Sequence, residues 1–299
     1  MTILGVVAAV SALAVGATER EATAAYEAKQ WEACAKAWSE LAAEVRAGVR
    51  KAQLLTSAAR CQAQAGKKAA AVASLEQALA LDPETEAKLR ADPELASVVS
   101  HPKFAAAAKK AAGVVASQNR ELAAEIMAMV ERDQAARNDA MARRAFAGSP
   151  EWKAIKALDA EHTRRLGEII AAHGWPGRKL VGKRASHGAW LLVQHATQDR
   201  PFQERCLALM QAAGDDVDPV NVAYLDDRLR ALRGDKQLFG TQFEAGDGGW
   251  RPRAIEDAEH VDERRRALGL SSLSEEIERL NAETPPPPPP TPAPADGGR

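Results

Sequence analysis

The sequence predicts a mostly α-helical protein with a single β-hairpin near its C-terminal end. Alanine dominates many windows and leucine recurs within them, and both residues favour helix. Helix start signals are clear, as at Ser149-Pro150, where a capping serine precedes a proline at the first helical position. The helical pattern changes only over residues 236–255, where two short runs flank the glycine-rich turn 245–249 and indicate a hairpin.

The charge balance and the cysteine spacing argue against a nucleic-acid-binding protein and against a structural zinc site. Lys and Arg number 40 against 41 Asp and Glu, so no basic field favours a nucleic-acid partner. Three cysteines without CxxC pairing do not predict a structural zinc site, and we expect no metal and no cofactor. Cys34 and Cys61 could form a disulfide on adjacent helices, although simple apolar packing is the commoner outcome.

The first 17 residues predict a secretory signal peptide. Residues 3–17 are apolar and uncharged, and they end in small residues, as signal peptidase requires. The run is shorter than the roughly 20 residues of a membrane span, so we expect no stable transmembrane segment. We therefore expect export to the periplasm or beyond. Because no Lys or Arg precedes the run, a buried helix of a cytoplasmic protein, or an uncleaved anchor, is the alternative.

Residues 18–115 predict short antiparallel helices. Within residues 55–83, Ala58-Ala59 are small where two helices would cross, Gly66 falls at a turn, and Asp82-Pro83 ends the unit. This segment resembles a tetratricopeptide repeat, and residues 26–41 repeat part of its pattern. The resemblance implies a groove for a peptide or partner protein. A helical scaffold packed on its neighbour is the alternative.

The rest of the chain predicts a second helical unit. Residues 116–148 read as a long connecting helix, and residues 149–283 as a helical domain that contains the hairpin. Gly174 and Pro176 end the first helix of that domain, and Asp218-Pro219 begin a later one. After residue 283 the proline-rich tail, 284–299, predicts a disordered segment outside any core.

Candidate acid–base groups gather between residues 173 and 199. His195 and Asp199 are four residues apart, so they share a helix face if the helix continues to Asp199. Such a pair could orient a general base, or it could be a structural hydrogen bond. His173 ends a helix, where it could act in catalysis or cap the last carbonyls. His162 lies in a strongly charged stretch and looks solvated.

Other residue types suit ligand binding. An indole can form a stacking wall, and glutamine amides can read amides or sugar hydroxyls. The candidate ligand-binding residues are Trp175, Gln194, Gln203, Tyr224, Gln242 and Asp257. Two further pairs, Asp227-Arg228 and Asp262 with Arg265, are expected to be interior ion pairs that hold the hairpin to the helices. No GxSxG, Walker, dinucleotide-binding or HExxH motif is present.

The segment from Trp152 to Leu280 resembles a bacterial family that is classed only as a domain of unknown function. The residues that carry the resemblance are His173-Gly174-Trp175-Pro176, Gln194-His195-Ala196, Gly240-Thr241-Gln242-Phe243 and Ile255-Glu256-Asp257, with Asp199, Asp227-Arg228 and Arg264-Arg265 among the others. Members often carry a variable helical region ahead of this domain. The resemblance implies no established activity.

Three functions are consistent with these observations. The first is a binding module, in which the helical repeats engage a partner and the C-terminal domain holds a peptide or small polar ligand. The second is a hydrolase or transferase for an amide or glycosidic substrate, with His173, His195 and Asp199 as acid–base groups. The third is a structural envelope protein. Convergence of the histidines and carboxylates on one open cleft would favour the enzyme.

Overall fold

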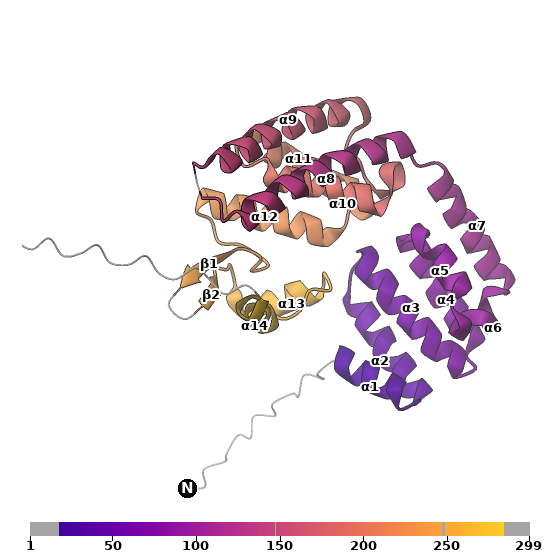
Figure 1. Ribbon diagram of the computed structural model, residues 1–299. Helices are drawn as coiled ribbons and strands as arrows, with labels where there is room; N and C mark the ends of the chain where they lie inside the picture. The colour runs from indigo at the N-terminus through magenta and orange to yellow at the C-terminus, as the bar shows by residue number, and fades with distance from the viewer. Residues whose placement is uncertain (1–17, 147, 247–248, 284–299) are drawn as a thin grey trace, which may run out of the picture.

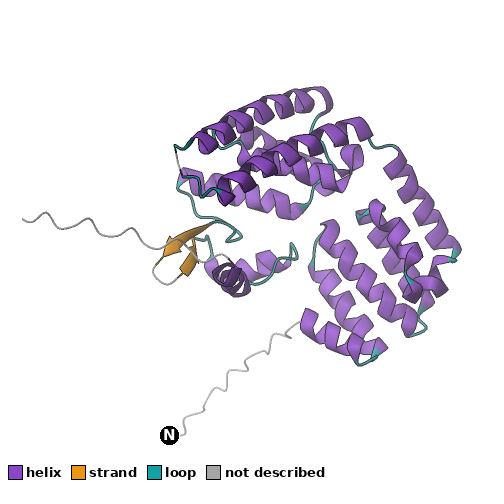
Figure 2. Ribbon diagram, in the orientation of Figure 1, coloured by secondary structure: helices purple, strands orange, loops and turns teal. Residues whose placement is uncertain are grey.

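The computed structural model describes residues 18–146, 148–246 and 249–283. The described chain forms two groups of helices, and a small two-stranded sheet is its only extended structure (Figures 1 and 2). The prediction of a mostly α-helical fold with one hairpin is therefore confirmed. The predicted signal peptide, 1–17, and the proline-rich tail, 284–299, lie outside the described residues.

The N-terminal group begins with antiparallel helices that pack on their neighbours in sequence. Its elements are α1 (Glu19–Glu27), α2 (Trp31–Glu44), α3 (Gly48–Gln64), α4 (Lys68–Leu81), η1 (Pro83–Thr85), α5 (Glu86–Ala91), η2 (Pro93–Leu95), α6 (Ala96–Val99) and α7 (Pro102–Ala116). Ala58 and Ala59 are fully buried, and Gly66 takes a positive φ of 74° at the turn between α3 and α4. The likeness of this pair to a tetratricopeptide repeat stays a prediction.

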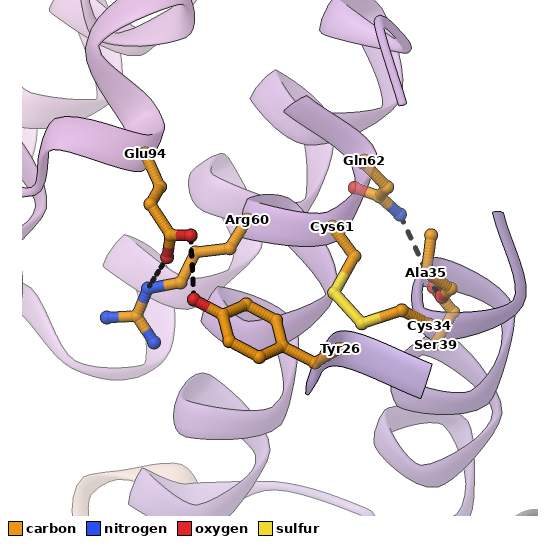
Figure 3. Close-up of a disulfide and its surroundings, with 8 residues drawn as sticks. All are labelled: Tyr26, Cys34, Ala35, Ser39, Arg60, Cys61, Gln62 and Glu94. Atoms are coloured by element: carbon orange, nitrogen blue, oxygen red, sulfur yellow. Dashed lines mark hydrogen bonds and ion pairs between the residues drawn. A yellow bond between two sulfur atoms is a disulfide. The ribbon is translucent and has the colours of Figure 1, made fainter. Parts of the chain in front are cut away.

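A disulfide joins α2 to α3. Cys34 and Cys61 are fully buried and bonded to each other, with their Cα atoms 5.8 Å apart (Figure 3). The expectation of simple apolar packing is thus replaced by a covalent link, because consecutive antiparallel helices bring the two thiols face to face. Cys206 is the only free cysteine of the part of the chain that the structure describes, and it is buried.

The C-terminal group has one continuous apolar core. Its helices are α8 (Arg120–Ala142), α9 (Pro150–His173), α10 (Arg178–His195), α11 (Arg200–Ala213) and α12 (Pro219–Arg233), with η3 (Gly214–Asp216) between the last two. Leu122, Ile126 and Met129 of α8 lie in the same core as residues of the other four helices. Helix α8 is therefore part of this group. Ser149 and Asp218 cap α9 and α12 as the sequence indicates.

The hairpin is shorter than the predicted 236–255. Strand β1 (Phe243–Gly246) pairs antiparallel with β2 (Gly249–Pro252), with Phe243 opposite Pro252. Before the hairpin, residues 237–242 form a loop, because buried side chains hold the backbone there. The Asp227 carboxylate accepts from the backbone N–H groups of Leu238, Phe239 and Thr241. After the hairpin come η4 (Ala258–His260), α13 (Val261–Arg266) and α14 (Leu273–Glu283).

The predicted ion pairs Asp227-Arg228 and Asp262 with Arg265 do not form. Asp227, Asp262 and Arg265 instead bind the backbone of the loops around the hairpin and α13. Asp262 accepts from the backbone N–H of Leu273 at 2.7 Å. The buried Arg265 donates to the backbone carbonyls of Ser271 and Phe239. Asp227, Asp262 and Arg265 therefore supply hydrogen-bond partners to backbone N–H and C=O groups of the loops, which would otherwise be buried without partners.

The start of α3 lies close to the start of α12, where a Cβ at Gly48 would meet Pro219 at 2.9 Å. Two further meetings of the two groups of helices are hydrogen-bonded. At one, the Glu84 carboxylate accepts from the backbone N–H of Lys183 at 2.6 Å, where α10 is kinked at Gly182. At the other, the segment after α13 returns to the loop between α2 and α3, and the Arg46 N–H donates to the carbonyl of Ala267 at 2.9 Å. No helix of the described residues is long and apolar enough to cross a membrane.

Candidate functional site

A pocket of about 470 Å³ opens between α9 and the start of α11. Six of its ten lining residues are polar or charged, and alanines with one phenylalanine supply much of the apolar surface. Its lining residues are Asp159, Ala160, Thr163, Arg164, Gly167, Ala196, Gln198, Asp199, Phe202 and Arg205. Pockets that hold small ligands combine an apolar surface with a few polar groups that fix orientation. We call this cavity the α9–α11 pocket.

Behind one wall of the pocket lies a network of buried charged groups. Asp159 lines the pocket, and its carboxylate accepts from Nη2 of Arg137 at 2.5 Å. The Nε of Arg137 donates to Asp133 at 3.0 Å, and Nδ1 of His195 lies 2.9 Å from both oxygens of Asp133. Helices α8, α9 and α10 therefore each contribute to one chain of contacts that ends at the pocket.

The hydrogen bonds fix the tautomer of His195. Nε of Arg137 lies 3.1 Å from Nδ1 of His195 and 3.0 Å from the Asp133 carboxylate, but its one proton favours the anion. Nδ1 of His195 therefore carries the proton and donates it to Asp133. In the neutral ring Nε2 then keeps a lone pair, and this atom has no hydrogen-bond partner among the described residues. The His195 side chain is 22% exposed, so it has the form of an oriented general base.

The Asp133 and Asp159 carboxylates are both buried, but their pKa values shift in opposite directions. Burial opposes ionisation of Asp133, but hydrogen bonds from His195 and Gln134 and the charges of His195 and Arg137 outweigh it and lower the Asp133 pKa. At Asp159 burial prevails over Arg137, and its pKa is raised. A pocket carboxyl with a raised pKa beside a fixed anion is an arrangement that acid–base chemistry uses, although structural networks also produce it.

His162 extends the network into the core. The side chain faces inward beside Asp159 and is only 2% exposed, so the expectation that it is solvated is wrong. Neither of its ring nitrogens has a hydrogen-bond partner among the described residues. Burial, with the nearby charge of Arg132, lowers the His162 pKa, so the ring is neutral at pH 7.

Two other charges of the pocket lack ion-pair partners among the described residues. Arg205 is exposed and lies over the ring of Phe202, 5.7 Å from its centroid. Asp199 precedes α11 and uses one oxygen to accept from the N–H of Phe202 at 2.9 Å. In contrast, Arg164 is bonded to Glu168 and Asp159 to Arg137. The pocket thus presents one unpaired anion and one unpaired cation.

The comparison with known families matches this region of the chain. A model of a family of unknown function, DUF6624, matches residues 120–284, which is more than half of the chain. The chain belongs to this family. The match covers α8 to α14, and so includes every residue of the pocket and of the charged network behind it. No curated protein and no solved structure matches the chain.

Within the DUF6624 domain the candidate acid–base residues do not converge. Helix α10 ends at His195, and Asp199 caps the next helix, so these two residues do not share a helix face. The carboxylate partner of His195 is Asp133 instead. His173 is exposed at the far end of α9, 14 residues and about 21 Å along the helix from Asp159.

The candidate ligand-binding residues are also dispersed. Trp175 belongs to the apolar core, and Gln203 is fully buried and donates to the backbone carbonyl of Val193 at 2.8 Å. The backbone N–H of Gln242 donates to Gln237 in the loop before the hairpin. Asp257 is exposed and paired with His260 and Arg264.

The last two candidates, Gln194 and Tyr224, do not line the pocket either. Gln194 is buried next to His195, and its side-chain Nε2 has no partner among the described residues. Tyr224 packs edge-on against Trp190, with ring centroids 6.2 Å apart. Of the candidate residues, the structure therefore brings Asp199 to the pocket and His195 to the network behind it.

Asp133, Arg137 and Asp159 were not predicted as site residues, although the spacing of the two aspartates along their helices indicates burial. On α9 the buried residues are Ile155, Asp159, His162, Leu166 and Ile169, which recur every three or four positions. Polar residues at apolar-stripe positions are costly to bury and therefore informative. Asp133 stands in the same relation to Leu122, Ile126 and Met129 on α8.

A second pocket, of about 490 Å³, lies in the N-terminal helices, outside the DUF6624 match. Its lining residues are Thr23, Tyr26, Trp38, Ser57, Arg60, Asp92, Pro93 and Glu94. Tyr26 donates to Glu94 at 2.7 Å and Arg60 pairs with Asp92 at 2.6 Å. Figure 3 shows Tyr26 and Arg60 directed at Glu94, close to the disulfide.

Proposed function

We propose that this chain is an exported binding module whose C-terminal domain holds a small polar ligand in the α9–α11 pocket. The observation that carries the proposal is the pocket itself, about 470 Å³ in volume and lined by carboxylate, guanidinium, amide and hydroxyl groups around the ring of Phe202. A cavity of this size accommodates a ligand of roughly drug size or smaller. The Cys34–Cys61 disulfide supports export, because such bonds persist in oxidising compartments.

A pocket-filling variant tests this proposal. Gly167 lines the pocket within α9, and a Cβ there would meet Phe202 at an ordinary contact distance of 3.7 Å. Gly167→Leu should therefore fold and occupy the cavity. Gly113→Leu is the control, since Gly113 also lies in a helix and has nothing within 4 Å of its Cβ position.

The measurement is a thermal-shift screen with amino acids, di- and tripeptides, saccharides and nucleosides, followed by calorimetry. We expect some of these compounds to bind the wild type and Gly113→Leu, but not Gly167→Leu. If no compound binds the wild type, or if Gly167→Leu binds equally well, the proposal fails.

We infer in addition that the N-terminal helices engage a peptide segment of a partner protein. Trp38 and Tyr26 give the second pocket an aromatic surface, and Arg60, Asp92 and Glu94 give it polar edges. Such surfaces are typical of interface hot spots. The test is chemical crosslinking of the partner in extracts of the native source. Trp38→Ala should lose the crosslinked partner, whereas Trp152→Ala, in the other group of helices, should keep it.

One observation favours a second function, acid–base catalysis. The Asp133–His195 pair leaves Nε2 of His195 without a partner among the described residues, as a general base requires. Such a base would activate water against an amide or glycosidic bond. Hydrolysis of Ala-Ala-Ala-p-nitroanilide and of p-nitrophenyl glycosides provides the assay. His195→Asn should lower any measured rate by about 100-fold or more, and no turnover by the wild type would exclude these reactions.

A further inference from the structure

The two unpaired charges of the α9–α11 pocket restrict the chemistry of its ligand. Among the pocket's four charged side chains, Asp159 is bound by Arg137 and Arg164 by Glu168. Asp199 and Arg205 have no ion-pair partner among the described residues. The guanidinium of Arg205 is supported by the ring of Phe202 at 5.7 Å, which orients it at the pocket wall.

The charge balance of the pocket opposes a ligand with a net charge. Because Asp159 and Arg164 are already paired, a simple anion bound at Arg205 would leave Asp199 unpaired, and a simple cation bound at Asp199 would leave Arg205 unpaired. A ligand that carries both an anionic and a cationic group can satisfy Arg205 and Asp199 together. Guanidinium–carboxylate and carboxylate–ammonium contacts are charge-assisted hydrogen bonds of this kind.

The spacing of the two residues sets the size of that ligand. Arg205 lies in α11 six positions after the N-cap residue Asp199, so the two backbone positions are about 9 Å apart along the helix axis. An extended peptide spans about 3.5 Å per residue. A di- or tripeptide therefore matches this backbone separation better than a free amino acid does. Ala160, Ala196 and Phe202 provide the apolar wall for its side chains.

We propose that the α9–α11 pocket binds a di- or tripeptide with both termini free, the carboxylate on Arg205 and the ammonium on Asp199. This inference rests on the proposed ligand-binding function and specifies its substrate class. The hydroxyl of Thr163 and the amide of Gln198 lie on the same pocket walls, and they donate to the backbone carbonyls of Asp159 and Lys156.

The test compares Ala-Ala-Ala and Ala-Ala with their N-acetylated and C-amidated forms by calorimetry on the full chain. We expect Kd values below about 1 mM for the free peptides, a loss of at least tenfold for either blocked form, and weaker binding of alanine. Arg205→Gln should lower affinity for the free peptide at least tenfold and leave affinity for the amide unchanged. Asp199→Asn should do the same with respect to the acetylated peptide, because Asn still caps the helix.

Arg200→Gln is the matched control, since Arg200 lies in the same helix but outside the pocket lining and is paired with Glu204, and it should change affinity less than threefold. If saccharides or nucleosides bind in a Gly167-dependent manner and the peptides do not, the peptide inference is overturned while the binding function stands. If blocked and free peptides bind equally, the inference is also overturned. Absence of binding by every compound class overturns both.

Discussion

At the scale of single residues, the feature that most distinguishes this protein is the placement of charge on apolar stripes. Asp133, Asp159 and His162 occupy positions where α8 and α9 would otherwise present core residues, and all three are almost fully buried. Burying such groups costs several kcal/mol per unpaired charge. Arg137 and His195 offset this cost for the carboxylates, whereas His162 has no hydrogen-bond partner in the part of the chain that the structure describes.

The unpartnered His162 predicts an acid-sensitive stability. Its pKa is lowered in the folded protein by burial and by Arg132, so as pH falls below about 6.5 the unfolded chain takes up a proton that the folded chain refuses. Stability should therefore fall with decreasing pH, at a slope of at most about 1.4 kcal/mol per pH unit for this one group.

Urea unfolding between pH 7.5 and 5.5 measures this slope. His162→Gln removes the titrating group and should flatten the profile, whereas His173→Gln, at an exposed site, should leave it unchanged. Parallel profiles for the wild type and His162→Gln would show that His162 does not titrate differently on folding.

At the scale of elements, the N-terminal helices depend on a covalent link. The disulfide between α2 and α3 closes a loop of 27 residues, for which the chain-entropy estimate is about 3.5 kcal/mol. Changing both Cys34 and Cys61 to Ala should lower the free energy of unfolding by about that amount. Dithiothreitol should destabilise the wild type and leave the double variant unaffected; an equal effect on both proteins, or none on the wild type, would contradict the link.

Much of this element structure could be predicted from sequence, because caps and periodicity are local. Ser149 and Asp218 begin α9 and α12 as predicted, and the hairpin turn lies within the predicted range. The site could not be predicted in the same way. The partner of His195 is Asp133, 62 positions earlier on another helix. The local choice, Asp199, failed because α10 ends at His195 and Asp199 instead caps α11, whose first turn contains Pro201.

At the scale of the whole molecule, the kink in α10 couples the two groups of helices. Gly182 has a φ of 80°, and a Cβ there would lie 3.0 Å from the Glu84 carboxylate, which binds the N–H of Lys183. Lys183 also pairs with Asp82 at 2.8 Å. Only glycine adopts this backbone without strain while allowing Glu84 to approach. The N-terminal group is thus held at the one point where α10 departs from helical geometry.

Gly182→Ala should therefore lower the free energy of unfolding by about 1–3 kcal/mol. Gly113→Ala is the control, because Gly113 lies in the interior of α7 with nothing near its Cβ position, and there the change should stabilise by up to about 1 kcal/mol. Chemical denaturation of both variants measures the difference. Equal effects of the two substitutions would mean that the kink imposes no strain on a side chain.

The central claim is that the α9–α11 pocket is the ligand site of the domain. Its most direct test is a ¹⁵N-resolved NMR titration of the wild type with the tightest-binding compound of the thermal-shift screen. The largest amide shifts should map to Gly167, Gln198 and Phe202, which line that pocket, and should disappear in Gly167→Leu. Shifts confined to the hairpin loop around Gln242, or to the aromatic pocket at Trp38, with the α9–α11 amides unmoved, would contradict the claim.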